Sequence, residues 1–172
     1  MAVRGLELSG LRLTTSAAAL LEKKPRLDIE HFVLRLSRAA VEALLPPGTP
    51  VKRVERLGGG AILLAVETRG LRATVEVRPG ASREGRLRLE VVSVKAGIFP
   101  IPAMVWTAAL RSAVPRRPGL LLTAENRIEV DLRVILRRKG VEIAPFRAVR
   151  VGEDVLELVI GDPPVRGAEG NR

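Results

Sequence analysis

Residues 62–91 read ILLAVETRGLRATVEVRPGASREGRLRLEV, and this stretch decides the fold class. Within it, residues 71–77 and 87–91 alternate aliphatic side chains with charged or polar ones. Successive side chains of a strand point to opposite faces of a sheet, so this alternation is typical of a strand with one buried and one solvated face. Because antiparallel sheets accommodate one wet face, we predict antiparallel strands here.

Turn residues divide the surrounding sequence into further strands. The pair Arg69 and Gly70 connects residues 62–68 to 71–77 in a predicted hairpin. The other predicted reversals are Gly58 to Gly60, the group Pro79, Gly80, Ser82 and Gly85, and the pair Gly152 and Glu153, which separates strands at 147–151 and 154–160. Alternation also returns at residues 127–134, which we predict to be one strand. Together these segments predict a meander of about six or seven strands.

Helix signals accompany the strands. Ser37 is a good N-cap for a helix over residues 38–45, which Pro46 and Pro47 end. A second helix is expected over residues 102–114, between Pro102 and Pro115, and a third over residues 15–24. The predicted class is α+β: a curved antiparallel meander packed on two or three helices. We expect one domain over residues 1–160, followed by a disordered tail at 161–172.

The charge balance favours anionic partners. The chain has 29 Lys plus Arg against 19 Asp plus Glu, a net charge of +10. Anionic membrane and nucleic acid both fit this charge, although an arginine-biased composition is an equal explanation. Nucleic acid is the less favoured partner, because binders of single strands stack bases on aromatic side chains and the charged strand faces here carry none.

No catalytic constellation is recognisable. The chain has one histidine, His31, and no cysteine, so nucleophile-and-base arrangements, metal sites and cofactors are not expected. We interpret His31 as an incidental surface or rim residue. Glu129 and Asp131 share a strand face with Arg127 and Arg133, which would keep both carboxylates ionised in a solvated ladder of modest energy. The prediction is a protein that is not an enzyme.

Apolar runs in the sequence are short. The N-terminal run spans residues 17–21, and the run at 103–110 is far below the roughly 20 residues of a membrane-spanning helix. We therefore expect a soluble, cytoplasmic protein, with peripheral membrane association left open.

The most informative segment for function is residues 94–114, VKAGIFPIPAMVWTAALRSAV. From residue 98 to 110 only Thr107 is polar, whereas a surface helix normally has a polar stripe. If Met104, Val105 and Ala108 face the sheet, Trp106 and Leu110 need a second apolar neighbour. That neighbour is core, a partner protein, a lipid chain or a bilayer surface.

Three strings give the chain a resemblance in layout to a known group. They are LRLSRAAVEALLP, LEVVSVKAGIFPIPAMVWTAAL and NRIEVDLRVIL. Over about residues 30–160 the order of these elements resembles the LmeA-like phospholipid-binding proteins and the tubular lipid-binding (TULIP) architecture. The resemblance implies a strongly curved antiparallel sheet around a long helix, an apolar groove for acyl chains, and lipid binding or transfer. Members of that group are typically exported or membrane-anchored, whereas this N-terminus shows no such signal.

The resulting hypothesis is non-enzymatic binding of a lipid or other apolar ligand in a groove between sheet and helix. The alternatives are a basic nucleic-acid-associated protein and a structural partner that docks through the apolar helix region 98–114. An oligomer is left open. Two basic residues past the helix are expected to contact an anionic headgroup, and six apolar residues to contact the ligand. The candidate ligand-binding residues are Ile98, Phe99, Ile101, Met104, Val105, Trp106, Arg116 and Arg117.

Overall fold

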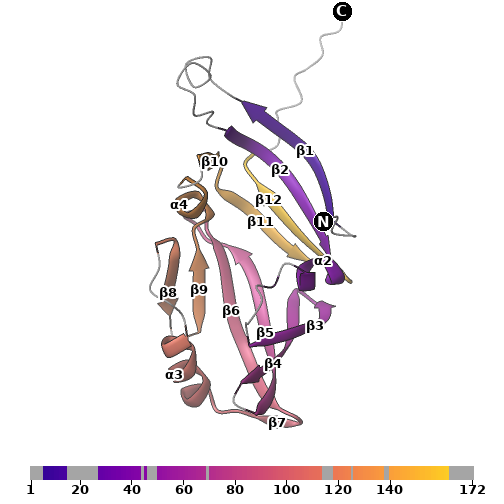
Figure 1. The fold of residues 1–172 in the computed structure, drawn as a ribbon, viewed down its shortest axis with the longest axis vertical. Helices are drawn as coiled ribbons and strands as arrows, with labels where there is room; N and C mark the ends of the chain where they lie inside the picture. The colour runs from indigo at the N-terminus through magenta and orange to yellow at the C-terminus, as the bar shows by residue number, and fades with distance from the viewer. Residues whose placement is uncertain are drawn as a thin grey trace, which may run out of the picture.

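Two β-sheets and three short helices form the described part of the chain, seen in a computed structural model (Figure 1). The structure describes residues 6–14, 27–43, 45, 50–68, 70–113, 118–124, 126–137 and 140–162. Within these residues one sheet has seven strands and the other has five. The predicted α+β class is confirmed.

A meander makes up most of the seven-stranded sheet. The strands β3 (Val51–Gly58), β4 (Ala61–Thr68), β5 (Leu71–Ala81) and β6 (Leu87–Ala96) pair antiparallel with their neighbours in chain order. Beyond β6 the order continues through β9 (Arg127–Val130) to β8 (Leu120–Ala124), and the short β7 (Phe99–Pro100) also pairs with β6. The turns predicted at residues 58–60 and at Gly70 join β3 to β4 and β4 to β5.

One predicted turn is wrong in part. Pro79 and Gly80 remain inside β5, opposite Leu89 and Arg88 of β6. The paired part of β4 begins at Ile62, opposite Val77, so Pro79 lies past the end of that neighbour and its missing N–H disturbs no bond to β4. The reversal follows at Ser82 to Gly85, where the Gly85 N–H donates to the Ser82 carbonyl at 3.0 Å.

The five-stranded sheet was not predicted as a separate sheet. Its order is β1 (Leu6–Thr14), β2 (Leu27–Ser37), β12 (Val155–Ile160) and β11 (Phe146–Val151), and β10 (Val141–Ile143) pairs parallel with β2. The strands predicted at residues 147–151 and 154–160 therefore exist, but they do not extend the meander. Of the two, β12 pairs with β2, more than a hundred residues away, in a register that places Leu36 opposite Leu156, and β11 pairs with β12.

Three helices are described. Helix α2 (Arg38–Ala43) is capped as predicted, because the Ala40 N–H donates to the Ser37 hydroxyl at 3.2 Å. Helix α3 (Ala103–Ala113) agrees with the prediction to within one residue at each end. The helix predicted at residues 15–24 lies outside the described residues, as do residues 163–172 of the tail predicted at 161–172. Gly161, the first residue of that predicted tail, is buried, and its N–H donates to the Pro145 carbonyl at 3.0 Å.

The third helix, α4 (Leu132–Arg137), corrects the strand predicted at residues 127–134. The strand ends at Val130, although the alternation of side chains continues. Asp131 then accepts the backbone N–H of Arg133 at 3.1 Å and so caps the helix that follows. Capping chemistry therefore overrides the period-two pattern at this point.

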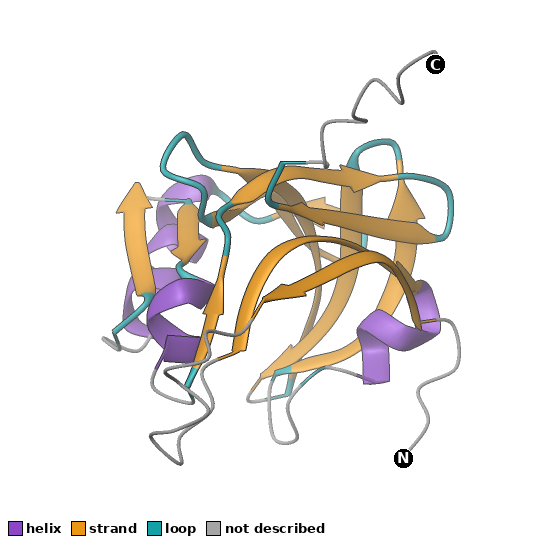
Figure 2. Ribbon diagram, turned by 90° about the horizontal axis from the view of Figure 1, so that it is seen from above, coloured by secondary structure: helices purple, strands orange, loops and turns teal. Residues whose placement is uncertain are grey.

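Register shifts bend the seven-stranded sheet. They occur in the pairing of β3 with β4, of β5 with β6 between Glu76 and Val77, and of β8 with β9. An extra residue in one strand of a pair bends that strand and increases its twist. Figure 2 shows the strands curving strongly, with the five-stranded sheet lying across the seven-stranded one.

The core lies on one face of the seven-stranded sheet. The five-stranded sheet covers one end of this face, where Leu36 and Leu156 pack with Val54, Leu57 and Ile62. Phe146 and Ile160 extend the same interface. Helix α3 covers the other end of the face, and the two covered areas meet at Leu64, which packs in both. The five-stranded sheet and α3 thus each cover one part of this face, and Leu64 is half-buried where the two parts meet.

Candidate functional site

An apolar cluster lies between α3 and strands β4, β5 and β6, and we call it the α3 cluster. Only its three valines, Val77, Val91 and Val94, are buried. The other members keep part of their surface exposed: Leu64, Ala73, Val75, Leu89, Ile101, Trp106 and Leu110. A packed core normally buries most of its members, so this cluster offers apolar surface that the described residues leave partly uncovered.

The sheet-facing side of α3 carries Trp106 and not Met104 or Val105. Trp106 and Leu110, one helical turn apart, pack on the sheet, whereas Met104, Val105 and Ala108 are exposed. Thr107 is buried on the sheet-facing side. Its hydroxyl donates to the Met104 carbonyl at 3.3 Å, so the buried hydroxyl has a hydrogen-bond partner within the helix.

The predicted ligand residues fall into separate groups. Ile101 and Trp106 belong to the α3 cluster, and the Ile101 N–H donates to the Val94 carbonyl at 2.8 Å. Met104 and Val105 are 82% and 57% exposed on the outer side of α3. Ile98 and Phe99 lie at the turn between β6 and β7. The two basic candidates, Arg116 and Arg117, lie outside the described residues.

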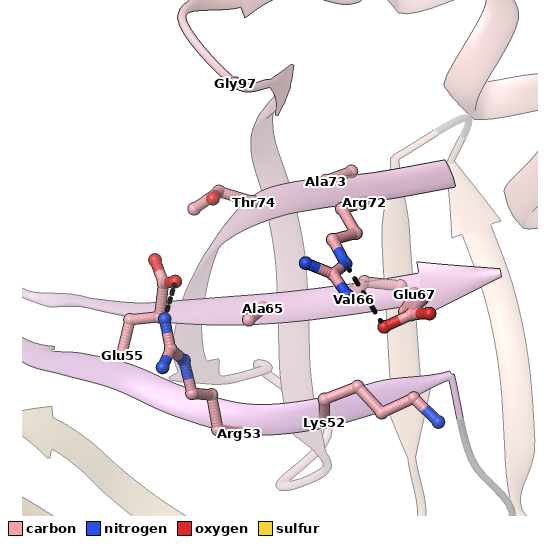
Figure 3. Close-up of a pocket in the computed structure, with 10 residues that line it drawn as sticks. All are labelled: Lys52, Arg53, Glu55, Ala65, Val66, Glu67, Arg72, Ala73, Thr74 and Gly97. Atoms are coloured by element: carbon pink, nitrogen blue, oxygen red, sulfur yellow. Dashed lines mark hydrogen bonds and ion pairs between the residues drawn. The ribbon is translucent and has the colours of Figure 1, made fainter. Parts of the chain in front are cut away.

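The outer face of the same sheet carries a polar hollow of about 410 Å³ (Figure 3). Small residues form its centre, and charged side chains surround them. Arg53 pairs with Glu55 at 3.2 Å and Arg72 with Glu67 at 3.5 Å, while Lys52 forms no ion pair with any described residue. The remaining lining residues are Ala65, Val66, Ala73, Thr74 and Gly97.

The carboxylates Glu129 and Asp131 belong to an ion cluster. Arg86 contacts them at 3.2 and 3.4 Å, and Arg133 contacts Asp131 at 2.9 Å. The solvated ladder predicted for this strand is therefore wrong for Asp131, which is buried. Hydrogen bonds from Arg133 lower the pKa of Asp131, although burial acts in the opposite direction. The pKa of Arg86 is raised, mainly by its hydrogen bond to Glu129. A general acid must keep its proton near neutral pH and therefore needs a raised carboxyl pKa. The lowered pKa of Asp131 fits an ionised group that stabilises the fold through its ion pairs.

His31 is also buried, which corrects its predicted place at the surface. Its Nδ1 lies 3.4 Å from the carbonyl oxygen of Gly161, at the end of β12. Within the described ranges no group of three or more His, Asp or Glu side chains is placed to hold a metal ion. No helix in those ranges is long and apolar enough to span a bilayer.

Known proteins give no further assignment. No family model matches the sequence, and no curated protein or solved structure matches it. The resemblance to the LmeA-like and tubular lipid-binding proteins therefore stays a prediction from layout.

Proposed function

We propose that the protein binds a lipid or another apolar ligand at the α3 cluster without converting it chemically. The observation that supports this proposal is the half-buried state of the cluster between sheet and helix. Apolar surface left in water costs about 25 cal/mol per Å², so a ligand that covers these side chains gains that energy. The proposal keeps the predicted function and the predicted place between sheet and helix, but the exposed Met104 and Val105 are no longer among the ligand-binding residues.

The side chains of the cluster favour a flexible alkyl ligand. Apart from Trp106 they are aliphatic, and none carries a charge. Pockets for specific polar ligands place several hydrogen-bonding groups among apolar walls, whereas the indole N–H of Trp106 is the one side-chain donor of this cluster. Trp106 is the only tryptophan of the chain and therefore reports on the site without labelling.

We expect the fluorescence of Trp106 to shift to shorter wavelength when a medium-chain fatty acid is added below its micelle concentration, because the alkyl chain replaces water beside the indole. Val75→Phe adds a ring to the half-buried cluster and should weaken this response about tenfold, a loss of about 1.4 kcal/mol in binding. The measurement is a fluorescence titration, with circular dichroism to confirm that each variant is folded.

Met104→Glu is the matched control, because it places a charge on the outer side of the same helix, where the side chain is exposed. It should leave the titration unchanged. A fluorescence response lost in Met104→Glu but retained in Val75→Phe would place the ligand on the outer side of α3. No response to any alkyl ligand, together with native mass spectra of the purified protein that show no bound lipid, would contradict the proposal.

A further inference from the structure

Exposed apolar side chains end the β6–β7 hairpin. Lys95 lies opposite Pro100 and Ala96 opposite Phe99, so Gly97 and Ile98 form a two-residue turn. Gly97 has a φ of 61°, the left-handed conformation that such turns require. Ile98 is 85% exposed and Phe99 is 71% exposed. Hairpin turns normally carry polar residues, so two large apolar residues here have no evident role in folding.

Strand β5 brings a third apolar residue to the same place. The register sets Thr74 opposite Lys95 and Val75 opposite Val94. The pairing ends at Thr74 and Lys95, and Arg72 and Leu71 are further residues of β5 toward the same end of the sheet. Arg72 and Gly97 line one hollow (Figure 3). Leu71 is 51% exposed, and we call Leu71, Ile98 and Phe99 the sheet tip.

Cations surround the sheet tip. Lys95 is exposed at the last position of β6 that pairs with β5, and the hollow contains Lys52, Arg53 and Arg72. Two carboxylates in the hollow, Glu55 and Glu67, pair with the two arginines. Neither lysine forms an ion pair with any residue in the described ranges. The region therefore has four cations against two carboxylates.

We infer that the sheet tip docks on an anionic membrane surface. Apolar side chains flanked by cations fit the boundary of a bilayer, where the apolar groups enter the acyl region and the cations contact anionic headgroups. A second copy of the chain docked through the same patch would set cations against cations, and nucleic acid would leave the apolar residues uncovered. A bilayer with anionic lipids satisfies both features at once.

The docking surface adjoins the proposed ligand site, and the inference rests on the proposed function, since a lipid binder must meet the membrane that supplies its ligand. Val94 precedes Lys95 directly and belongs to the α3 cluster. Ile101, three residues after Ile98, belongs to the cluster as well. Docking by the sheet tip would therefore bring the half-buried cluster close to the lipid surface.

Vesicle co-sedimentation tests the inference with the full chain. The wild type should bind vesicles of phosphatidylglycerol and phosphatidylcholine, bind phosphatidylcholine vesicles far less, and release from the anionic vesicles at high salt. The double variant Ile98→Asp, Phe99→Asp should weaken binding to anionic vesicles about tenfold or more, because it removes the inserting side chains and adds repulsion. Lys52→Glu, Lys95→Glu should weaken it about as much.

Matched controls lie at the opposite end of the molecule. Val134→Asp replaces an exposed apolar residue of α4, which lies far from β7 (Figure 1). Arg83→Glu reverses an exposed charge in the β5–β6 turn, at the other end of these strands. Both controls should bind anionic vesicles like the wild type. All these sites are exposed, and far-ultraviolet circular dichroism confirms the fold of each variant.

The outcomes separate docking from ligand binding. The docking inference is wrong if the wild type does not bind anionic vesicles, or if the tip variants and the control variants bind them equally. It is also wrong if the protein instead binds RNA tightly, or forms a dimer that Phe99→Asp dissociates. The titration of Trp106 with monomeric fatty acid stands independently. A normal titration with no vesicle binding overturns docking alone, and vesicle binding with no titration response overturns the proposed ligand site alone.

Discussion

Replacing Gly161 with alanine should lower the free energy of unfolding by about 3–5 kcal/mol. Gly161 has a φ of 70°, where an L side chain is strained, and the added Cβ would collide with the backbone carbonyl of Glu30 in β2. The Gly161 backbone cannot move aside easily, because its N–H donates to the Pro145 carbonyl at 3.0 Å and it follows directly on the buried Ile160. Equilibrium unfolding in urea measures the loss.

Gly70→Ala is the control for this variant. Gly70 has a similar φ of 80°, but no atom lies within 4 Å of the position that its Cβ would take. Only the conformational strain remains there, at about 1–2 kcal/mol. Equal losses in the two variants would show that the contact with Glu30 does not matter.

The meander could be predicted because its information is local. Each pair of neighbouring strands from β3 to β6 is joined by a short turn, and alternation on either side of residues 58–60 and Gly70 sets the strand limits. In such an arrangement each strand pairs with the next one along the chain. Sequence patterns of about ten residues are therefore enough to predict the pairing.

The second sheet could not be predicted from such patterns. Strand β2 pairs with β12 and, in parallel, with β10. The alternation of side chains within β2 does not indicate which strands become its neighbours. These pairings are decided by which apolar faces bury best once the chain has collapsed. Leu36 and Leu156, for example, meet Val54 and Leu57 from the other sheet.

The sequence pattern located part of the exposed apolar surface, whereas the ligand-binding role of its residues stays a prediction. The missing polar stripe in residues 98–110 correctly marked a segment with uncovered apolar surface. The orientation of α3 stayed open at the level of sequence, because Thr107, the one polar residue of the segment, satisfies its hydroxyl within the helix and can be buried beside Trp106. The sheet tip was partly visible, since Ile98 and Phe99 were candidates. The contribution of Leu71 and Lys52 depends on strand register, which composition does not reveal.

Replacing Asp131 with alanine should lower the free energy of unfolding by about 3–4 kcal/mol. The buried carboxylate caps α4 and accepts the Arg133 Nε at 3.0 Å, and Arg86 lies 3.4 Å away. Alanine removes the cap and leaves two arginines without this partner. The exposed Arg150, which pairs with Glu157 at 3.0 Å, is the control, and Arg150→Ala should cost no more than about 1 kcal/mol. Equal losses, measured by urea unfolding, would show that burial of Asp131 adds nothing.

Acid titration distinguishes the charge of Asp131 from its role as a cap. Hydrogen bonds from Arg133 hold the pKa of Asp131 below its ordinary value of 3.8, so the unfolded chain binds the proton more tightly than the folded one. The resulting stability is present above the ordinary pKa and is lost as the pH falls through the lower pKa of the folded state. Asp131→Asn keeps a capping oxygen but cannot titrate. Its free energy of unfolding should therefore fall less steeply than that of the wild type when the pH is lowered below about 4. Parallel curves for the two proteins would mean that the ion cluster contributes no charge-dependent stability.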